Sequence, residues 1–282
     1  MQWIGKPQRL LSFVTLVIFL SACTVTVNET GKLGRISIDP PAVAYVRPQI
    51  ISARFHDPSS YTQGLILVNG VFYESGGQYG ESTLRKVDPQ TGTVLQMISI
   101  PAQYFAEGLA LVGDRLIQLT WKEQVAFIYD VNTFEKIGEY SYEGEGWGLC
   151  YDGEWLYMSN GSSNLTRRDP NTFEVKETIP VTLFDQPVSQ LNELECVGNS
   201  VYANIYTTDQ IVKIDKHSGR VSAYIETARM LNDGASLLTA EQANLMYQRQ
   251  VLNGIAYDPE KDVFLITGKY WPVLFEVRLD ER

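Results

Sequence analysis

The tetrapeptide Gly108-Leu109-Ala110-Leu111 is one of five related segments in this chain of 282 residues. The other four are Gly64-Leu65-Ile66-Leu67, Gly148-Leu149-Cys150-Tyr151, Glu193-Leu194-Glu195-Cys196 and Gly254-Ile255-Ala256-Tyr257. Successive segments begin 44, 40, 45 and 61 residues apart. A period of about 40 to 45 residues is typical of the four-stranded blades of a β-propeller. The repeat therefore predicts a propeller.

Further short runs of strand-forming residues follow each segment, for example 71–73, 84–87 and 94–100 after the first one. The turns between the third and fourth runs begin with Asp88, Asp130, Asp169 and Asp215, and Asp is a typical turn residue. The fifth segment lacks a fourth run, whereas residues 50–55 precede the first segment without a partner. If residues 50–55 supply the missing fourth strand of the last blade, no sheet edge is left exposed. We therefore predict an all-β, five-bladed β-propeller closed by an N-terminal strand.

The interval of 61 residues contains an insertion, roughly residues 227–250. Thr239-Ala240-Glu241-Gln242 matches a capping box, which indicates the start of a helix. We predict a short helical insertion before the last blade. Because it leads directly into a first strand, it could form a lid or a wall at that rim.

The composition excludes several classes of protein. Hydrophobic residues make up 44% of the chain and aromatic residues 11%, as expected for a folded protein rich in strands. There are 23 Lys and Arg against 33 Asp and Glu, a net charge of −10. An acidic balance argues against broad binding to nucleic acid. We expect no nucleic acid partner, and a monomer.

The first 23 residues have the plan of a secretory signal: Lys6 and Arg9, an apolar run from 10 to 20, and Ser21-Ala22-Cys23. The run is shorter than the roughly 20 residues that span a bilayer. Leu20-Ser21-Ala22-Cys23 resembles the lipobox of bacterial lipoproteins. We predict a lipoprotein signal peptide (1–23), a tether and N-terminal extension (24–49) and the propeller (50–282). Lipidation of Cys23 would anchor the exported protein to a membrane of the bacterial cell envelope.

The remaining cysteines, Cys150 and Cys196, show no CxxC spacing. In the aligned repeats they are one residue out of phase, so they should lie on opposite strand faces. A disulfide between them is therefore not expected. His56 and His217 are isolated in the sequence, and we predict no metal site built from histidine.

Propeller geometry brings selected residues to one mouth, because first strands begin and second strands end at the same rim. Three of the residues expected at this mouth are aromatic, although a solvent-exposed rim needs only polar side chains. The polar and aromatic residues expected there include Gln63, Glu107, Trp121, Trp147, Asn192, Tyr206 and Lys269. Taken singly, Glu107 and Lys269 would be solvated surface charges and the tryptophans packing residues. Together they predict a pocket.

Six motifs at this rim resemble those of the plant-type glutaminyl-peptide cyclotransferases and their bacterial members. They are Tyr61-Thr62-Gln63-Gly64-Leu65, Phe105-Ala106-Glu107-Gly108-Leu109, Gly146-Trp147-Gly148-Leu149, Leu191-Asn192-Glu193-Leu194-Glu195, Val251-Leu252-Asn253-Gly254-Ile255 and Thr267-Gly268-Lys269-Tyr270-Trp271-Pro272. They occur in order over roughly residues 55–279. The resemblance implies a five-bladed enzyme that forms pyroglutamate from the N-terminal Gln of peptides or proteins, without a catalytic cofactor.

The resemblance also implies the roles of the residues. The catalytic residues would be Glu107, Asn192 and Lys269. Gln63, Trp121, Trp147 and Tyr206 would bind substrate, and Tyr206 departs from the Trp usual in the plant members. The reaction needs a proton acceptor that later donates, which suits Glu107. Negative charge on the carboxamide oxygen could be stabilised by Asn192 and Lys269.

Two alternatives stay open. One is a propeller lipoprotein without enzymatic activity that binds peptides or envelope proteins at the same mouth. The other is a propeller lactonase or hydrolase, which would use carboxylates and Asn around a metal, and Glu107, Asn192 and Asn253 offer few of these. Glu193 replaces the glycine of the other copies and is either a hydrogen-bonded structural carboxylate or part of a calcium site in the channel.

Overall fold

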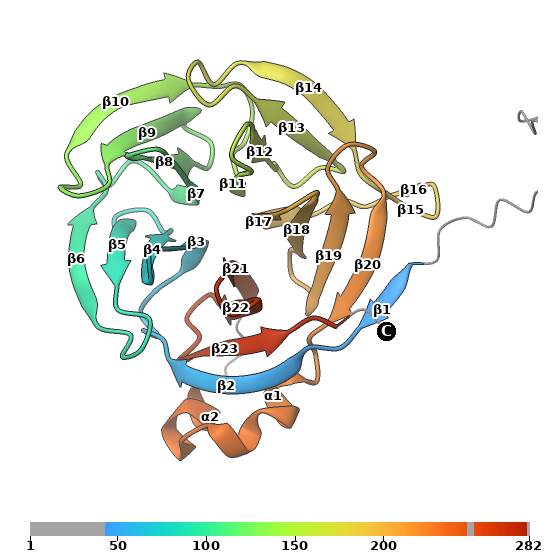
Figure 1. Ribbon diagram of the computed structural model, residues 1–282. Coiled ribbons are helices and arrows are strands. Elements are labelled where there is room, and N and C mark those ends of the chain that lie inside the picture. Colours follow the sequence, from blue (N-terminus) through green and yellow to red (C-terminus); the bar gives the residue numbers. More distant parts are fainter. Residues whose placement is uncertain (1–42, 247–250, 281–282) are drawn as a thin grey trace, which may run out of the picture. The chain divides into compact units, whose positions relative to one another are not determined.

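Five sheets surround a central axis in the computed structural model, which describes residues 43–246 and 251–280 (Figure 1). Blade 1 contains β3 (Thr62–Val68), β4 (Val71–Gly76), β5 (Thr83–Val87) and β6 (Val94–Ser99). Blade 2 contains β7 (Ala106–Val112), β8 (Arg115–Thr120), β9 (Val125–Asp130) and β10 (Lys136–Ser141). Blade 3 contains β11 (Leu149–Tyr151), β12 (Leu156–Met158), β13 (Asn164–Arg168) and β14 (Val175–Pro180). The predicted five-bladed propeller is confirmed.

The last two blades include strands from the N-terminal part of the described chain. Blade 4 contains β17 (Leu191–Val197), β18 (Ser200–Ile205), β19 (Gln210–Asp215), β20 (Val221–Glu226) and β1 (Ala44–Val46). Blade 5 contains β21 (Leu252–Asp258), β22 (Val263–Gly268), β23 (Val273–Arg278) and β2 (Gln49–Phe55). The sequence did not indicate β1, which pairs in parallel with β20. It also did not indicate the small hairpin of β15 (Thr182–Leu183) and β16 (Gln186–Pro187).

The ring closes as predicted, because β2 pairs antiparallel with β23 from Gln49 opposite Arg278 to Phe55 opposite Val273. An ion pair between Arg54 and Glu276 crosses this seam. The N-terminal strand thus covers the edge that β23 would otherwise expose.

Alternate residues of each inner strand pack against opposite neighbouring blades. Leu65 belongs to the apolar cluster shared with blade 5, and the next residue, Ile66, belongs to the cluster shared with blade 2. There are five such clusters among the described residues, one for each pair of adjacent blades. Burial of these side chains between blades supplies the apolar contacts of the ring.

The glycines of the repeat permit the inner strands to approach one another closely. A Cβ atom added at Gly108 would lie 2.5 Å from the backbone N of Leu149 and 2.7 Å from the carbonyl oxygen of Trp147. No side chain fits at that separation, so only glycine permits this close approach of two inner strands.

Cys150 and Cys196 form a disulfide with a Cα–Cα distance of 5.5 Å, and the prediction that they would not pair is wrong. The two cysteines do lie on opposite faces of their strands, as predicted. The prediction was wrong because it treated both strands as if they belonged to one sheet, where opposite faces point apart. The two cysteines lie on different blades. Cys150 belongs to the apolar cluster between blades 3 and 4, and Cys196 packs against that cluster. Because residues on opposite faces of adjacent blades point toward each other, the phase difference brings the two sulfur atoms together.

The insertion folds into α1 (Met230–Asp233), a 3₁₀ turn η1 (Ala235–Leu237) and α2 (Ala240–Met246). The capping box is confirmed, since Gln242 N–H donates to Thr239 Oγ1 at 3.1 Å and Thr239 N–H donates to Gln242 Oε1 at 2.8 Å. None of the helices in the described ranges is long and apolar enough to cross a membrane.

The predictions for residues 1–23, including lipidation of Cys23, lie outside the described residues, as does most of the predicted tether.

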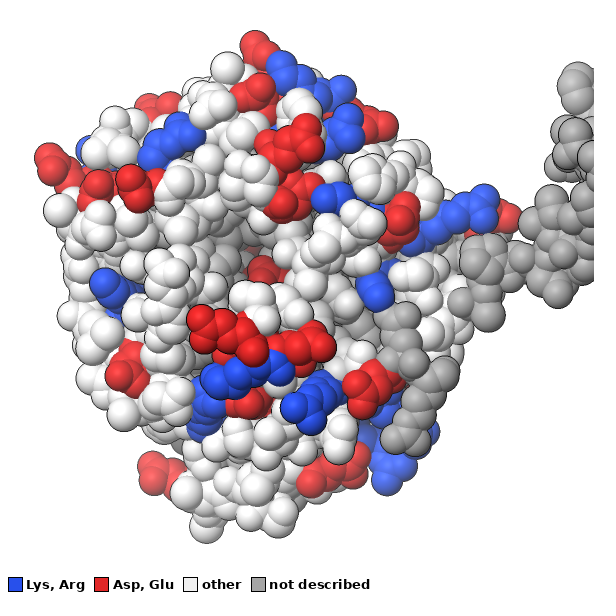
Figure 2. Space-filling view, in the orientation of Figure 1, with Lys and Arg blue, Asp and Glu red and all other residues white. Residues whose placement is uncertain are grey.

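On the face shown in Figure 2, acidic and basic side chains are interspersed around a central hollow, without a broad basic patch. A face without a broad basic patch is what the acidic net charge of −10 predicts.

Candidate active site

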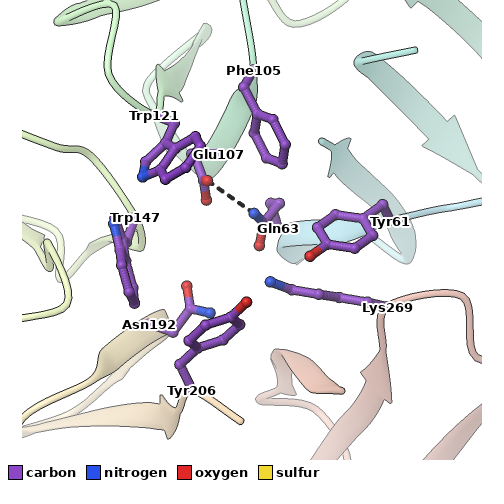
Figure 3. A pocket seen from close by; sticks show the side chains of 9 residues that line it. All are labelled: Tyr61, Gln63, Phe105, Glu107, Trp121, Trp147, Asn192, Tyr206 and Lys269. Atoms are coloured by element: carbon purple, nitrogen blue, oxygen red, sulfur yellow. Dashed lines mark hydrogen bonds between the residues drawn. The ribbon is translucent and has the colours of Figure 1, made fainter. Parts of the chain in front are cut away.

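Nine side chains enclose a cavity of about 230 Å³ at the predicted mouth (Figure 3). They are Tyr61, Gln63, Phe105, Glu107, Trp121, Trp147, Asn192, Tyr206 and Lys269. The structure therefore brings together all seven pocket residues predicted from the sequence. Tyr61 and Phe105 were not assigned to the site, although each begins one of its motifs. The described residues of the insertion do not line the cavity, so the expected lid or wall is not seen there.

Irregularities in the inner strands aim three of these side chains into the cavity. The strand register shifts between Thr62 and Gly64 in blade 1, between Ala106 and Leu109 in blade 2, and between Leu191 and Leu194 in blade 4. Gln63, Glu107 and Asn192 lie within these shifts. A β-bulge changes the direction of a side chain relative to the regular alternation of the strand. The same local distortion thus places each polar group at the mouth.

Glu107 is a buried carboxylic acid with one oxygen available for a ligand. It is only 4% exposed. Its Oε1 accepts a hydrogen bond of 2.9 Å from Gln63 Nε2, and its Oε2 has no hydrogen-bond partner among the described residues. Burial raises the pKa of Glu107 well above its usual value, the Lys269 charge opposes this, and Glu145 and Glu123 add to it. The carboxyl group is therefore suited to exchange a proton at a pH above the ordinary range for Glu.

The amide of Gln63 is held on both sides. While its nitrogen donates to Glu107, its Oε1 accepts a hydrogen bond of 3.1 Å from Asn253 Nδ2, which also donates to the carbonyl oxygen of Thr62 at 2.9 Å. From the sequence, Asn253 was placed at the mouth within one of the six motifs, but the one role considered for this residue was as a metal ligand of a lactonase. Like Asn192, Asn253 lies at the start of a first strand. That position in the repeat was the sequence signal that its side chain could hold another group at the mouth, here the amide of Gln63.

Lys269 contributes a nearly buried cation, only 3% exposed. Its Nζ lies 4.6 Å from the ring centroid of Tyr61 and 4.7 Å from that of Tyr206, so the ammonium contacts two aromatic faces. Burial lowers the pKa of Lys269 to about 8, although the nearby Glu107 carboxylate opposes the change. Asn192 lies on β17, the inner strand of the neighbouring blade 4, and its Oδ1 is buried without a hydrogen-bond partner among the described residues.

The aromatic side chains form most of the cavity wall. Phe105 packs edge-on against Tyr61 and Trp121, with ring centroids 6.0 Å and 5.6 Å apart. On the opposite side Trp147 packs edge-on against Tyr206 at 5.4 Å. This wall could hold the aliphatic part of a small side chain and exclude water.

Glu193 lies deeper along the axis and makes two hydrogen bonds. Its carboxylate oxygens accept backbone N–H groups of Leu65 at 3.3 Å and Ile255 at 2.8 Å. These contacts support the structural interpretation of Glu193. Across residues 43–246 and 251–280 there is no group of three or more His, Cys, Asp or Glu side chains arranged to hold a metal ion. The possible calcium ion in the channel stays a prediction.

Comparison with known proteins gives concordant results. A family model described as glutamine cyclotransferase matches residues 16–279. The chain is 36% identical over 235 residues to a glutaminyl-peptide cyclotransferase of Arabidopsis thaliana, covering 83% of this chain and 71% of the relative. The crystal structure of the Myxococcus xanthus glutaminyl cyclase matches with a TM-score of 0.76 and 36% identity, covering 85% of this chain and 99% of that one. The WD40 repeats of RRP9, at 8% identity and a TM-score of 0.53, share the fold alone.

Proposed function

The chain belongs to the glutamine cyclotransferase family, and we propose that its cavity converts the N-terminal glutamine of peptides or proteins into pyroglutamate and ammonia. It is therefore a transferase, and the roles of its individual residues are our proposal. One observation carries that proposal. Glu107 Oε2, which has no hydrogen-bond partner among the described residues, lines the same small aromatic cavity as the ammonium group of Lys269.

In the proposed reaction the α-amino nitrogen of the substrate attacks the carbon of its own γ-carboxamide. A carbon–nitrogen bond forms, closing the five-membered ring, and the bond to the amide nitrogen breaks. Glu107 Oε2 accepts the proton that the attacking amine loses and returns it to the departing nitrogen, which leaves as ammonia. The raised pKa of Glu107 brings it closer to that of an α-amine, about 7.7 to 8.0, so the proton can move in both directions.

Negative charge develops on the carboxamide oxygen in the tetrahedral intermediate. The Lys269 ammonium and the Asn192 side-chain amide are the groups proposed to stabilise it. Because Lys269 is held between two tyrosine rings and shielded from water, its charge interacts strongly with a nearby oxyanion and needs little reorganisation. The aromatic wall would hold the flexible glutamine side chain folded, close to the geometry of attack.

The pH dependence of ammonia release from a glutaminyl dipeptide tests these roles. Below the raised pKa of Glu107 the carboxyl group is already protonated and cannot accept a proton, so kcat should fall on acidification at a pH well above the ordinary pKa of Glu. The parameter to follow is kcat, because ionisation of the free substrate amine affects kcat/KM. Above a pH of about 8 Lys269 loses its charge, and kcat should fall again. Since the substrate amine becomes more nucleophilic at high pH, that fall must come from the enzyme. An acid limb near pH 4.3, the ordinary value for Glu, would contradict the assignment of Glu107.

The two rival functions make different predictions for the same preparation. A binding scaffold would bind glutaminyl peptides and release no ammonia. A lactonase would hydrolyse lactones in a reaction that EDTA abolishes. We propose that cyclisation needs no cofactor and is insensitive to EDTA.

We further propose that the protein is exported and anchored to the cell envelope through lipidated Cys23, because residues 20–23 have the lipobox pattern. Labelled palmitate should enter the wild-type protein when it is expressed in a bacterium. Cys23→Ala should remove the label and release the protein from the membrane fraction. Label that persists in this variant would contradict lipidation at Cys23.

A further inference from the structure

One carboxylate oxygen joins the two tryptophans of the cavity. Glu145 lies in the connection between β10 and β11, with 40% of its side-chain surface exposed. Its Oε2 accepts hydrogen bonds from Trp121 Nε1 at 2.8 Å and from Trp147 Nε1 at 3.0 Å. The two indoles come from different blades, since Trp121 follows β8 and Trp147 precedes β11. Glu145 was not among the residues predicted for the site.

The backbone around Glu145 is also fixed. The N–H of Gly146 donates to the carbonyl oxygen of Trp121 at 2.9 Å, and the N–H of Trp147 donates to that of Ser159 at 3.1 Å. The carbonyl of Trp147 in turn accepts the N–H of Gly108 at 2.7 Å, directly beside the catalytic Glu107. Glu145 therefore bonds the indoles from a segment that is itself tied to the strand carrying the proton acceptor.

A lysine completes the arrangement on the outer side. Lys122 Nζ lies 3.8 Å from Glu145 Oε1 and 3.7 Å from the ring centroid of Trp121. The second carboxylate oxygen thus faces a cation, which leaves Oε2 to the indoles.

We propose that Glu145 is a positioning residue for the cyclisation reaction, which fixes the planes of Trp121 and Trp147 and occupies their N–H groups so that only ring surfaces face the substrate. This inference rests on the proposed function. The anion of Glu145 bonds Trp121 and Trp147 on one side of the aromatic wall. On the other side the cation of Lys269 lies between Tyr206 and Tyr61 (Figure 3).

The arrangement narrows the set of groups that can bind the carboxamide. Both indole N–H groups are used by Glu145, and one of the two N–H groups of Gln63 Nε2 is used by Glu107. Asn192, Lys269 and the second N–H of Gln63 then remain as amide or cationic donors for the carboxamide. The tryptophans contribute shape and exclusion of water, so their benefit depends on orientation.

Glu145 also acts at a distance on the proton acceptor. Its negative charge, with that of Glu123, raises the pKa of Glu107, whereas Lys269 lowers it. Replacing Glu145 by glutamine keeps an oxygen that can accept the indole N–H groups but removes this charge. Replacing it by alanine removes both. The two substitutions therefore separate positioning from charge.

The test compares Glu145→Ala, Glu145→Gln and, as a control, Glu143→Ala, an exposed carboxylate of the same connection. Glu145→Ala should lower kcat/KM for a glutaminyl dipeptide by about ten- to a hundredfold, because misorientation of the wall costs reactive geometry. Glu145→Gln should stay within about threefold of the wild type, because the hydrogen bonds are retained. The acid limb of its kcat should move to lower pH, because the charge that raises the pKa of Glu107 is gone, and a purely structural role would not produce that shift. Glu143→Ala should match the wild type.

Three outcomes would overturn the inference. They are wild-type kcat/KM in Glu145→Ala, an equal loss in Glu145→Gln, and an equal loss in Glu143→Ala. If Glu145→Ala does not fold, the rate and the acid limb of Glu145→Gln still decide the matter. Failure of this inference is distinguishable from failure of the proposed function, because in the latter case the wild type itself would release no ammonia.

Discussion

Glu107→Gln should lower kcat by about 10²- to 10⁴-fold, the contribution typical of a general acid–base group. At 1.36 kcal/mol for each factor of ten, this is a rise of about 3 to 5 kcal/mol in the activation barrier. Glutamine keeps the shape of the side chain and an oxygen that can accept the hydrogen bond from Gln63 Nε2, but it cannot shuttle a proton. The loss should therefore appear in turnover rather than in binding.

The measurement combines ammonia release with calorimetric titration. Because the variant turns over slowly, its affinity for the glutaminyl dipeptide itself can be measured, and it should be close to the KM of the wild type if KM reflects binding. Glu135→Gln, an exposed carboxylate of the same blade, serves as the control and should behave like the wild type. An unchanged kcat in Glu107→Gln would exclude Glu107 as the proton acceptor.

Removal of the closing strand should have the largest effect on stability. Deleting residues 1–60 removes β1 and β2, so it exposes the edge of β23 and breaks the Arg54–Glu276 ion pair. It also removes His56, whose Nε2 lies 3.1 Å from Glu74 Oε1 in a buried pair. At roughly 1 kcal/mol for each net hydrogen bond, and more for the buried glutamate, the loss should exceed about 5 kcal/mol. That is comparable to the whole stability of many domains.

Thermal unfolding of two truncations measures this effect. Deleting residues 1–33 removes neither closing strand and should leave Tm close to that of the full chain. Deleting residues 1–60 should lower Tm sharply or prevent folding. If it prevents folding, a synthetic peptide of residues 44–60 added during refolding should restore ammonia release. Equal Tm values for the two truncations would contradict closure of the ring by β2.

The repeat made the fold accessible to sequence reasoning, because each blade uses the same strand and turn chemistry. The Asp that begins each predicted turn makes the same hydrogen bonds in four blades. Asp88, Asp130, Asp169 and Asp215 each accept backbone N–H groups two and three residues ahead. By contrast, β1 has three residues and no counterpart in the repeat, so nothing in the sequence indicated its parallel pairing with β20.

The site was predictable where propeller geometry converts strand positions into one mouth, as it does for Glu107, Asn192 and Lys269. It was not predictable where a role depends on contact between blades. In the sequence Glu145 is an ordinary charged residue of a connecting segment. Only the structure shows that Trp121 and Trp147 both donate hydrogen bonds to its Oε2. The disulfide was missed for the same reason, since strand phase was considered within one blade.

The central claim is that the α-amine of an N-terminal glutamine displaces its side-chain nitrogen in this cavity. A peptide carrying nitrogen-15 only in the side-chain amide of that glutamine tests it most directly, with ammonia and peptide both analysed by mass spectrometry. The account predicts labelled ammonia and an unlabelled pyroglutamyl peptide in equal amounts. Unlabelled ammonia, labelled ammonia accompanied by an N-terminal glutamate, or peptide binding without any ammonia would contradict it.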